Sequence, residues 1–112
     1  MRWYCDGSGW NGQSSGFAVV PEKGMAIVEE QKKELTNNQM EYAAVIRALA
    51  FCNIGDEILT DSLLVVNQVN GKWRVKESHL KPLCAAAQHH LKDKSATLKW
   101  IPREENKAGK YF

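Results

Sequence analysis

The first third of the chain alternates apolar segments with turn-forming residues in a way that predicts three strands. Residues 1–6 are rich in β-favouring aromatics, and the run DGSGWNGQSSG separates them from a second apolar segment at 16–20. A turn at 21–24 leads to a third segment, 25–31. Strands joined in this way form an antiparallel meander, and the charged run EEQKKE at its end is typical of an edge strand.

The apolar spacing becomes helical after residue 36. This spacing predicts a helix over 37–53, with Gly55 as the stop. Its apolar stripe consists of Ala44, Val45, Ala48, Leu49 and Cys52.

The second half of the chain alternates short strands with helices. We expect strands at 57–60 and 96–101, and helices at 62–70 and 77–91, the latter with a break near Pro82. Residues 102–112 then begin a further helix. This order predicts an α/β domain with a mixed sheet.

Length and composition predict a single domain over residues 1–112. A chain of 112 residues with 44% hydrophobic content supports one compact core but not two. No apolar run approaches the roughly 20 residues of a membrane span, and the opening MRWYCDG lacks an apolar signal core. We expect a soluble cytoplasmic monomer.

Three cysteines are present, at Cys5, Cys52 and Cys84. Their odd number and wide spacing favour neither a disulfide framework nor a zinc site. We therefore expect reduced, mostly buried thiols.

Three acidic residues stand where the predicted elements meet. Asp6 ends the first strand and Asp61 directly follows the fourth, and the carboxyl ends of neighbouring strands in an α/β sheet open into one crevice. Glu41 shares the helix face of the apolar stripe, so its carboxylate faces the sheet. We expect the three acids to converge in a partly dry pocket.

Converging carboxylates repel one another unless a divalent cation compensates them. Their hard oxygen atoms select Mg²⁺ or Mn²⁺ rather than zinc. Two such ions support hydrolysis of a phosphodiester without a serine or histidine nucleophile. In an alternative interpretation each acid has only a local role: Asp6 caps a turn, Glu41 favours the first turn of its helix, and Asp61 caps the next helix.

Four segments resemble the type 1 ribonuclease H family, in family order and over nearly the whole chain. They are YCDGSG with Asp6, TNNQMEY with Glu41, LTDSLLVVNQVNGKWRVK with Asp61, and WIPREENKAG. The resemblance implies an α/β ribonuclease H-like fold with a five-stranded mixed sheet flanked by helices. Its first three strands are antiparallel, and its fourth and fifth run parallel to the first.

The same resemblance implies a magnesium-dependent endonuclease that cleaves RNA paired with DNA. Asp6, Glu41 and Asp61 match the family's first three metal-binding carboxylates. Further matches imply contacts with the hybrid, because distinguishing RNA from DNA requires touching the 2′-hydroxyl across the minor groove. The matching substrate residues are Gly7, Ser8, Thr36, Asn37 and Asn38, of which Thr36 matches a phosphate-binding position on the DNA strand.

Trp73 matches a family position that places an aromatic ring against the DNA strand, and Lys72 and Arg74 flank it as phosphate contacts. Core packing is the alternative role for Trp73. We expect Trp100 to lie in the core because it belongs to the last strand, and the histidines to lie at the surface. The histidines are His79, His89 and His90.

The family's fourth carboxylate is missing from its expected position, which Lys110 occupies. Glu104 and Glu105 are the candidate substitutes, unless an acid lies further along a longer chain. Two alternatives to an active nuclease therefore stay open. One is a domain that binds hybrids without cutting them, and the other is a fragment of a larger reverse transcriptase-like protein.

Overall fold

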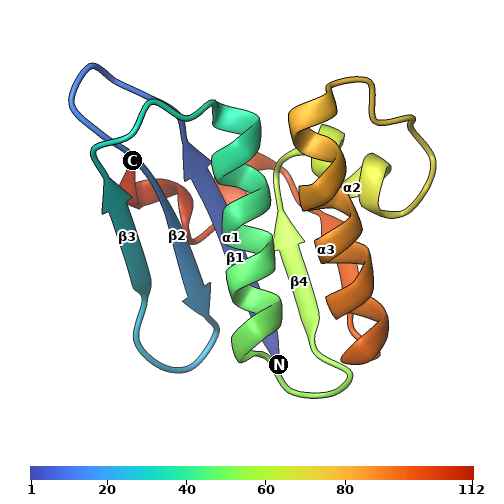
Figure 1. Ribbon diagram of the computed structural model, residues 1–112. Coiled ribbons are helices and arrows are strands. Elements are labelled where there is room, and N and C mark those ends of the chain that lie inside the picture. The colour runs from blue at the N-terminus through green and yellow to red at the C-terminus, as the bar shows by residue number, and fades with distance from the viewer.

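The computed structural model describes residues 1–112, with all five strands in a single sheet (Figure 1). The strands are β1 (Arg2–Ser8), β2 (Ser15–Pro21), β3 (Ile27–Gln31), β4 (Glu57–Thr60) and β5 (Thr97–Trp100). The α-helices are α1 (Asn37–Phe51), α2 (Leu63–Val69) and α3 (Lys81–Asp93).

The sheet is mixed, in the order β3-β2-β1-β4-β5. β2 pairs antiparallel with both β1 and β3, whereas β4 runs parallel to β1 and β5 runs parallel to β4. These pairings confirm the expected sheet, with the charged β3 at one edge. Because β1 and β4 are parallel neighbours, their carboxyl ends lie side by side.

α1 and α3 pack on one face of the sheet and enclose the main core (Figure 1). All five residues of the apolar stripe predicted for this helix are buried in the main core, the last of them, Cys52, directly after α1. The helical spacing therefore predicted burial correctly. The C-terminal segment crosses the opposite face, where Ala108 packs against Tyr4, Ala18 and Leu59. All three cysteines are free and buried, as expected.

Two predicted helical segments differ from the structure. The segment predicted at 77–91 begins as the 3₁₀ turn Ser78–Leu80 and becomes α-helical at Lys81. Pro82 lies in the first turn of α3, where its missing N–H interrupts no helical hydrogen bond. The helix expected at 102–112 is absent. Two 3₁₀ turns, Arg103–Glu105 and Gly109–Tyr111, replace it on either side of the extended residue Asn106.

The placement of Trp100 in the core was wrong. Its side chain is 44% exposed, because β5 is an edge strand and Trp100 is its last residue. The indole Nε1 instead donates to the backbone oxygen of Asp61 at 3.1 Å.

No helix of the structure combines the length and apolar character needed to cross a membrane.

Candidate metal centre

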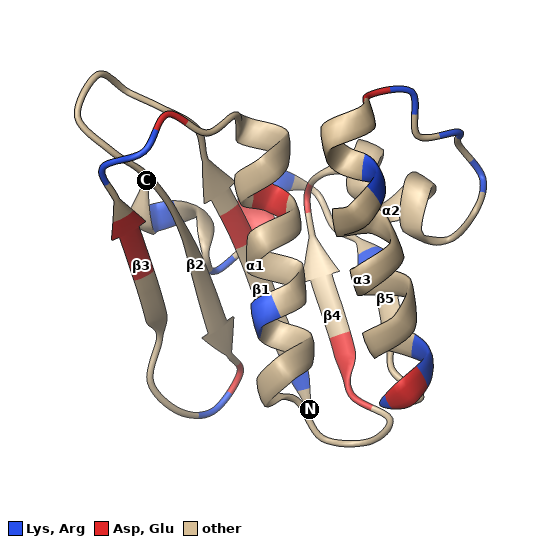
Figure 2. Ribbon diagram, viewed as in Figure 1, with Lys and Arg blue, Asp and Glu red and all other residues tan.

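The register of the two central parallel strands brings two of the predicted acids together. Cys5 of β1 aligns with Thr60 of β4, so Asp6 and Asp61 are the next residues along neighbouring strands. α1 delivers Glu41 from the helix side, and Figure 2 shows acidic positions of β1 and α1 next to each other. One carboxylate oxygen from each acid lies within 4.8 Å of those from the other two. The acids thus converge as the sequence predicted.

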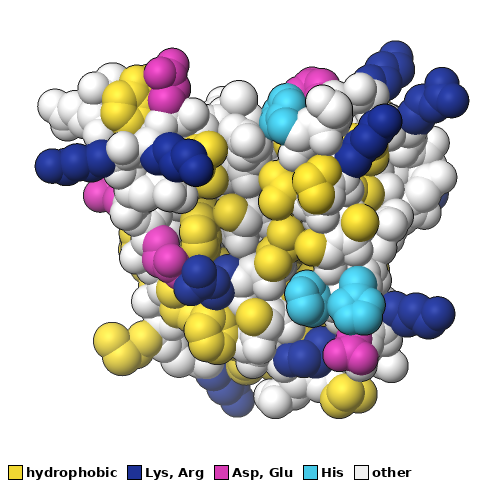
Figure 3. All heavy atoms as spheres, in the orientation of Figure 1, with side chains coloured by type: hydrophobic (Ala, Val, Ile, Leu, Met, Phe, Trp, Pro, Cys, Tyr) yellow, Lys and Arg dark blue, Asp and Glu magenta, His cyan; other side chains and the backbone are white.

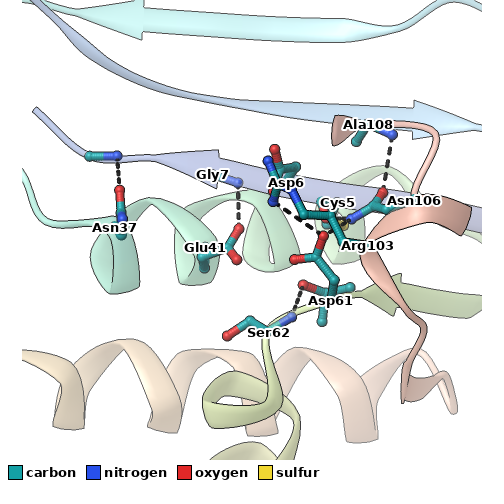
Figure 4. A network of polar contacts seen from close by, with 12 residues as sticks. Cys5, Asp6, Gly7, Asn37, Glu41, Asp61, Ser62, Arg103, Asn106 and Ala108 are labelled. Atoms are coloured by element: carbon teal, nitrogen blue, oxygen red, sulfur yellow. Dashed lines mark hydrogen bonds and ion pairs between the residues drawn. The ribbon is translucent and has the colours of Figure 1, made fainter. Parts of the chain in front are cut away.

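Two side chains of α1 fix the first turns of this helix against β1. They accept hydrogen bonds from backbone N–H groups at the end of β1 and directly after it. Glu41 Oε1 accepts from the Gly7 N–H, and Asn37 Oδ1 accepts from the Gly9 N–H (Figure 4). These N–H groups lie beyond Cys5, where the pairing of β1 with β4 ends. The i, i+4 spacing on the helix matches the i, i+2 spacing on the strand.

The two glycines of this contact permit the helix to approach the strand. A Cβ atom at Gly7 would collide with the backbone of Met40 and Glu41. One at Gly9 would lie 2.6 Å from the Asn37 backbone nitrogen. The motif DGSG therefore has a packing requirement in addition to the substrate role that the resemblance implies.

The start of α1 is set by a reciprocal capping interaction. The Thr36 hydroxyl accepts from the Gln39 N–H at 3.1 Å, and the Gln39 side chain accepts from the Thr36 N–H at 2.9 Å. Asp61 does not cap α2, because the Ser62 hydroxyl accepts from the Val65 N–H at 3.2 Å instead. The local capping role considered for Asp61 is therefore wrong, and its carboxylate is left for the acid cluster.

The electrostatics of the site favour a bound cation. Burial, reinforced by the Asp61 carboxylate, raises the pKa of Asp6 to about 6. Burial and the Asp6 charge raise the pKa of Glu41 to about 8. A positive charge between these groups would lower both values and keep the oxygens ionised. The donor set contains only carboxylates, which fits a hard ion such as Mg²⁺ or Mn²⁺.

The C-terminal segment adds two nitrogen-bearing residues that were not predicted as site residues. Arg103 Nη1 lies 3.5 Å from Asp61 Oδ2 and 3.8 Å from Asp6 Oδ1 (Figure 4). Asn106 Nδ2 donates to the Cys5 backbone oxygen at 2.8 Å and lies 3.4 Å from Asp61 Oδ2. Their position just after β5 could have indicated that they lie near the acids, because β5 ends beside β4, the strand that precedes Asp61.

The structure does not bring the candidate fourth ligands into the cluster. Glu104 and Glu105 are exposed in the 3₁₀ turn that follows Pro102, and neither belongs to the group of converging acids. Lys110 is also exposed, with its ammonium 5.4 Å from the centre of the Tyr111 ring. The cluster therefore consists of three carboxylates.

The predicted substrate residues lie at the end of β1, at the start of α1 and in the loop after α2. Ser8 ends β1, Thr36 is the exposed N-cap of α1, and Asn38 is half-buried in the first turn of that helix. Trp73 is 50% exposed, which argues against a role in core packing. The Lys72 and Trp73 N–H groups both donate to the Asn67 backbone oxygen, which holds this basic loop after α2.

The basic side chains of the segment between α2 and α3 project from one corner of the molecule, as Figure 3 shows. Trp73, Arg74 and Lys76 line a pocket of about 260 Å³ together with residues of α2. The three histidines lie outside the acid cluster, and His79 pairs with Glu77 at 3.3 Å.

The mixed sheet and the three acids at its crevice together define a ribonuclease H-like domain.

Known proteins place the chain in a family. Residues 5–112 match the reverse transcriptase-like family. The chain is 31% identical over 110 residues to the bifunctional protein Rv2228c of Mycobacterium tuberculosis, covering 89% of this chain but 30% of that protein. Over 75 residues it is 35% identical to a ribonuclease H of Clostridium botulinum, covering 62% of this chain and 49% of that protein.

Solved structures show the same similarity. The N-terminal RNase H domain of Rv2228c superposes with a TM-score of 0.77 at 27% identity, covering 94% of this chain and 84% of that one. LC11-RNase H1, isolated from compost and solved in complex with an RNA/DNA hybrid, gives a TM-score of 0.73 at 31% identity, covering 95% and 88%. The chain therefore belongs to the reverse transcriptase-like family, within the ribonuclease H group of proteins.

Proposed function

We propose that this chain is an endonuclease that hydrolyses the RNA strand of RNA/DNA hybrids with the help of divalent cations. The observation that carries the proposal is the convergence of Asp6, Glu41 and Asp61 within 4.8 Å, in a fold shared with ribonucleases H. A relative of the same fold is known in complex with an RNA/DNA hybrid, which supports this choice of substrate. The chain itself spans less than half the length of the curated relatives named above.

Asp6, Glu41 and Asp61 would hold Mg²⁺ or Mn²⁺. When bound, such ions supply Lewis-acid activation of water and stabilisation of the leaving oxygen, in the two-ion arrangement that we expect. The protein contributes a rigid donor set, because Asp6 lies within β1 and Glu41 is held by the Gly7 N–H. Two ions require more ligands than three carboxylates, so the substrate phosphate would complete the second position, or Glu104 or Glu105 after turning toward the acids from their exposed positions.

Recognition of the hybrid is proposed for the surface on both sides of the acids. Gly7, Ser8, Asn37 and Asn38 would contact RNA sugars and base edges in the minor groove. Thr36 would bind a phosphate of the DNA strand while its hydroxyl caps α1. On the opposite side Trp73 would pack against a DNA sugar, and its half-exposed ring beside basic side chains supports this role.

We further propose one domain over residues 1–112, acting as a monomer in the cytoplasm. The single sheet with one main core supports the domain assignment. Three buried cysteines without a disulfide are typical of a reducing compartment.

Cleavage of a labelled RNA/DNA hybrid with Mg²⁺ or Mn²⁺ tests the proposal. The Asp61→Asn variant is expected to lose at least about a hundredfold in rate, because a neutral amide binds the ion weakly. Asp93→Asn, the same substitution at an exposed site at the end of α3, is the matched control and is expected to cleave like the wild type. Equal cleavage by Asp61→Asn and the wild type would reject the assignment.

A second candidate is a domain that binds hybrids without cutting them. It is favoured by Arg103 beside the acids and by Lys110 at the position of the expected fourth carboxylate. This candidate predicts salt-sensitive hybrid binding and no turnover with either ion. The same cleavage assay, combined with a filter-binding measurement, separates the two functions.

A further inference from the structure

The acid cluster contains its own cation. Arg103 is the only basic residue that forms an ion pair with Asp6 or Asp61, and Glu41 forms none. Two of the three carboxylates that converge within 4.8 Å thus pair with a single guanidinium, and Figure 4 shows Arg103 beside Asp61. This leaves the cluster with an excess of negative charge when no metal is present.

The chain holds Arg103 in this position from both sides. Before it, the Trp100 indole donates to the Asp61 backbone oxygen at 3.1 Å. After it, the buried Asn106 side chain donates to the Cys5 backbone oxygen and accepts from the Ala108 N–H. Only a short segment separates these anchors, so the backbone at Arg103 stays beside the acids.

The guanidinium itself remains free to leave. The Arg103 side chain is 67% exposed, and both of its contacts with the acids are long for an ion pair, at 3.5 and 3.8 Å. A divalent cation between the acids would repel it, and water would solvate the displaced group at little cost. The fixed backbone and the free side chain are the properties of a displaceable counter-ion.

We propose that Arg103 is the resident counter-ion of Asp6 and Asp61, and that a divalent cation displaces it on binding. The proposal rests on the proposed function, since it concerns the same acids. Its consequence is that Arg103 weakens the binding of the first ion while stabilising the metal-free protein.

Titration calorimetry with MnCl₂, without nucleic acid and at low salt, tests the proposal. We expect Arg103→Gln to bind Mn²⁺ about threefold to tenfold more tightly than the wild type, the range for one partly screened charge pair. Arg103→Lys keeps the charge and is expected to stay near the wild-type affinity. Lys23→Gln makes the same charge change at an exposed residue outside the cluster and outside the proposed hybrid-binding surface, so it controls for net charge.

Thermal melting provides a second measurement. Arg103→Gln should melt a few degrees lower than the wild type without metal, and the difference should vanish in saturating Mn²⁺. Equal Mn²⁺ affinity in the wild type and Arg103→Gln, or an equal gain in Lys23→Gln, overturns the proposal.

Hybrid cleavage, measured separately, distinguishes this proposal from the proposed function. Cleavage by the wild type together with unchanged Mn²⁺ affinity in Arg103→Gln rejects the counter-ion alone. Absence of Mn²⁺ binding by every variant rejects both.

Discussion

Two buried aspartates at opposite ends of the central strands have opposite pKa shifts. Asp6 and Asp56 are 2% and 5% exposed, so burial works against the charge of both. The pKa of Asp6 is nevertheless raised to about 6, whereas that of Asp56 is lowered to about 2. The difference lies in what surrounds the two carboxylates.

Asp56 is surrounded by hydrogen-bond donors. Its two oxygens accept from the Met1 ammonium, the Trp3 indole Nε1 and the Asn53 N–H, each at 2.9 Å. These donors outweigh the effect of burial and favour the charged form. The satisfied carboxylate holds β4 and the first residues of β1 together, and it offers no oxygen to a metal.

Asp6 is surrounded by other acids instead. Asp61 and Glu41 face it, and Arg103 at 3.8 Å compensates only in part. Burial alone therefore does not identify a functional acid. A buried carboxylate whose neighbours are also carboxylates lacks a partner that an external cation can supply.

Replacing Asp56 gives the largest expected effect on stability. Asp56→Asn should lower the free energy of unfolding by about 2–3 kcal/mol, because charge-assisted hydrogen bonds to buried groups are lost. Chemical denaturation measures this change. Mn²⁺ affinity should not change, and a weaker Mn²⁺ site in this variant would show that the two ends of the sheet are coupled.

The pH dependence of the metal-free protein comes next in size. Asp6 and Glu41 keep their protons to higher pH in the folded protein than in the unfolded chain, so stability falls as pH rises from about 5 to 8. The two raised pKa values set an upper bound of about 5 kcal/mol over this range, and relaxation of the site reduces the loss that we expect to roughly 2 kcal/mol.

Asp56 contributes in the opposite direction, and only in acid. Its lowered pKa gives stability that is complete above about pH 4 and is lost as pH falls toward 2. Urea denaturation at several pH values in the presence of a chelator separates the two windows. A stability that stays flat between pH 5 and 8 would contradict the raised pKa values.

The smallest expected effect is a gain in stability. Asp6→Asn removes one repelling charge and should stabilise the metal-free protein at pH 8 by roughly 1 kcal/mol. It should also remove most of the stabilisation that Mn²⁺ gives. The same Asp→Asn change would thus have opposite signs at residues 6 and 56, and loss of stability in both variants would mean that both acids serve the fold.

Local patterns along the chain were enough to predict the elements that carry the acids. Helical spacing over 37–53 gave α1 and its buried stripe, and the positions of Asp6 and Asp61 relative to two strands gave two members of the cluster. These features are local, because capping, periodicity and strand ends depend on nearby residues. The resemblance of four segments to a known family then implied the directions of the five strands, which local patterns do not contain.

The role of the C-terminal segment, in contrast, depends on contacts that form only in the folded chain. Its residues form 3₁₀ turns rather than a helix, because Asn106 bonds to the backbone of Cys5, which lies 101 positions earlier in the chain. The same contact directs Arg103 toward the acids, while Glu104 and Glu105 lie outside the cluster. The opposite pKa shifts of Asp6 and Asp56 likewise depend on partners that are distant in sequence. Such contacts depend on how the elements pack, so no pattern along the chain specifies them.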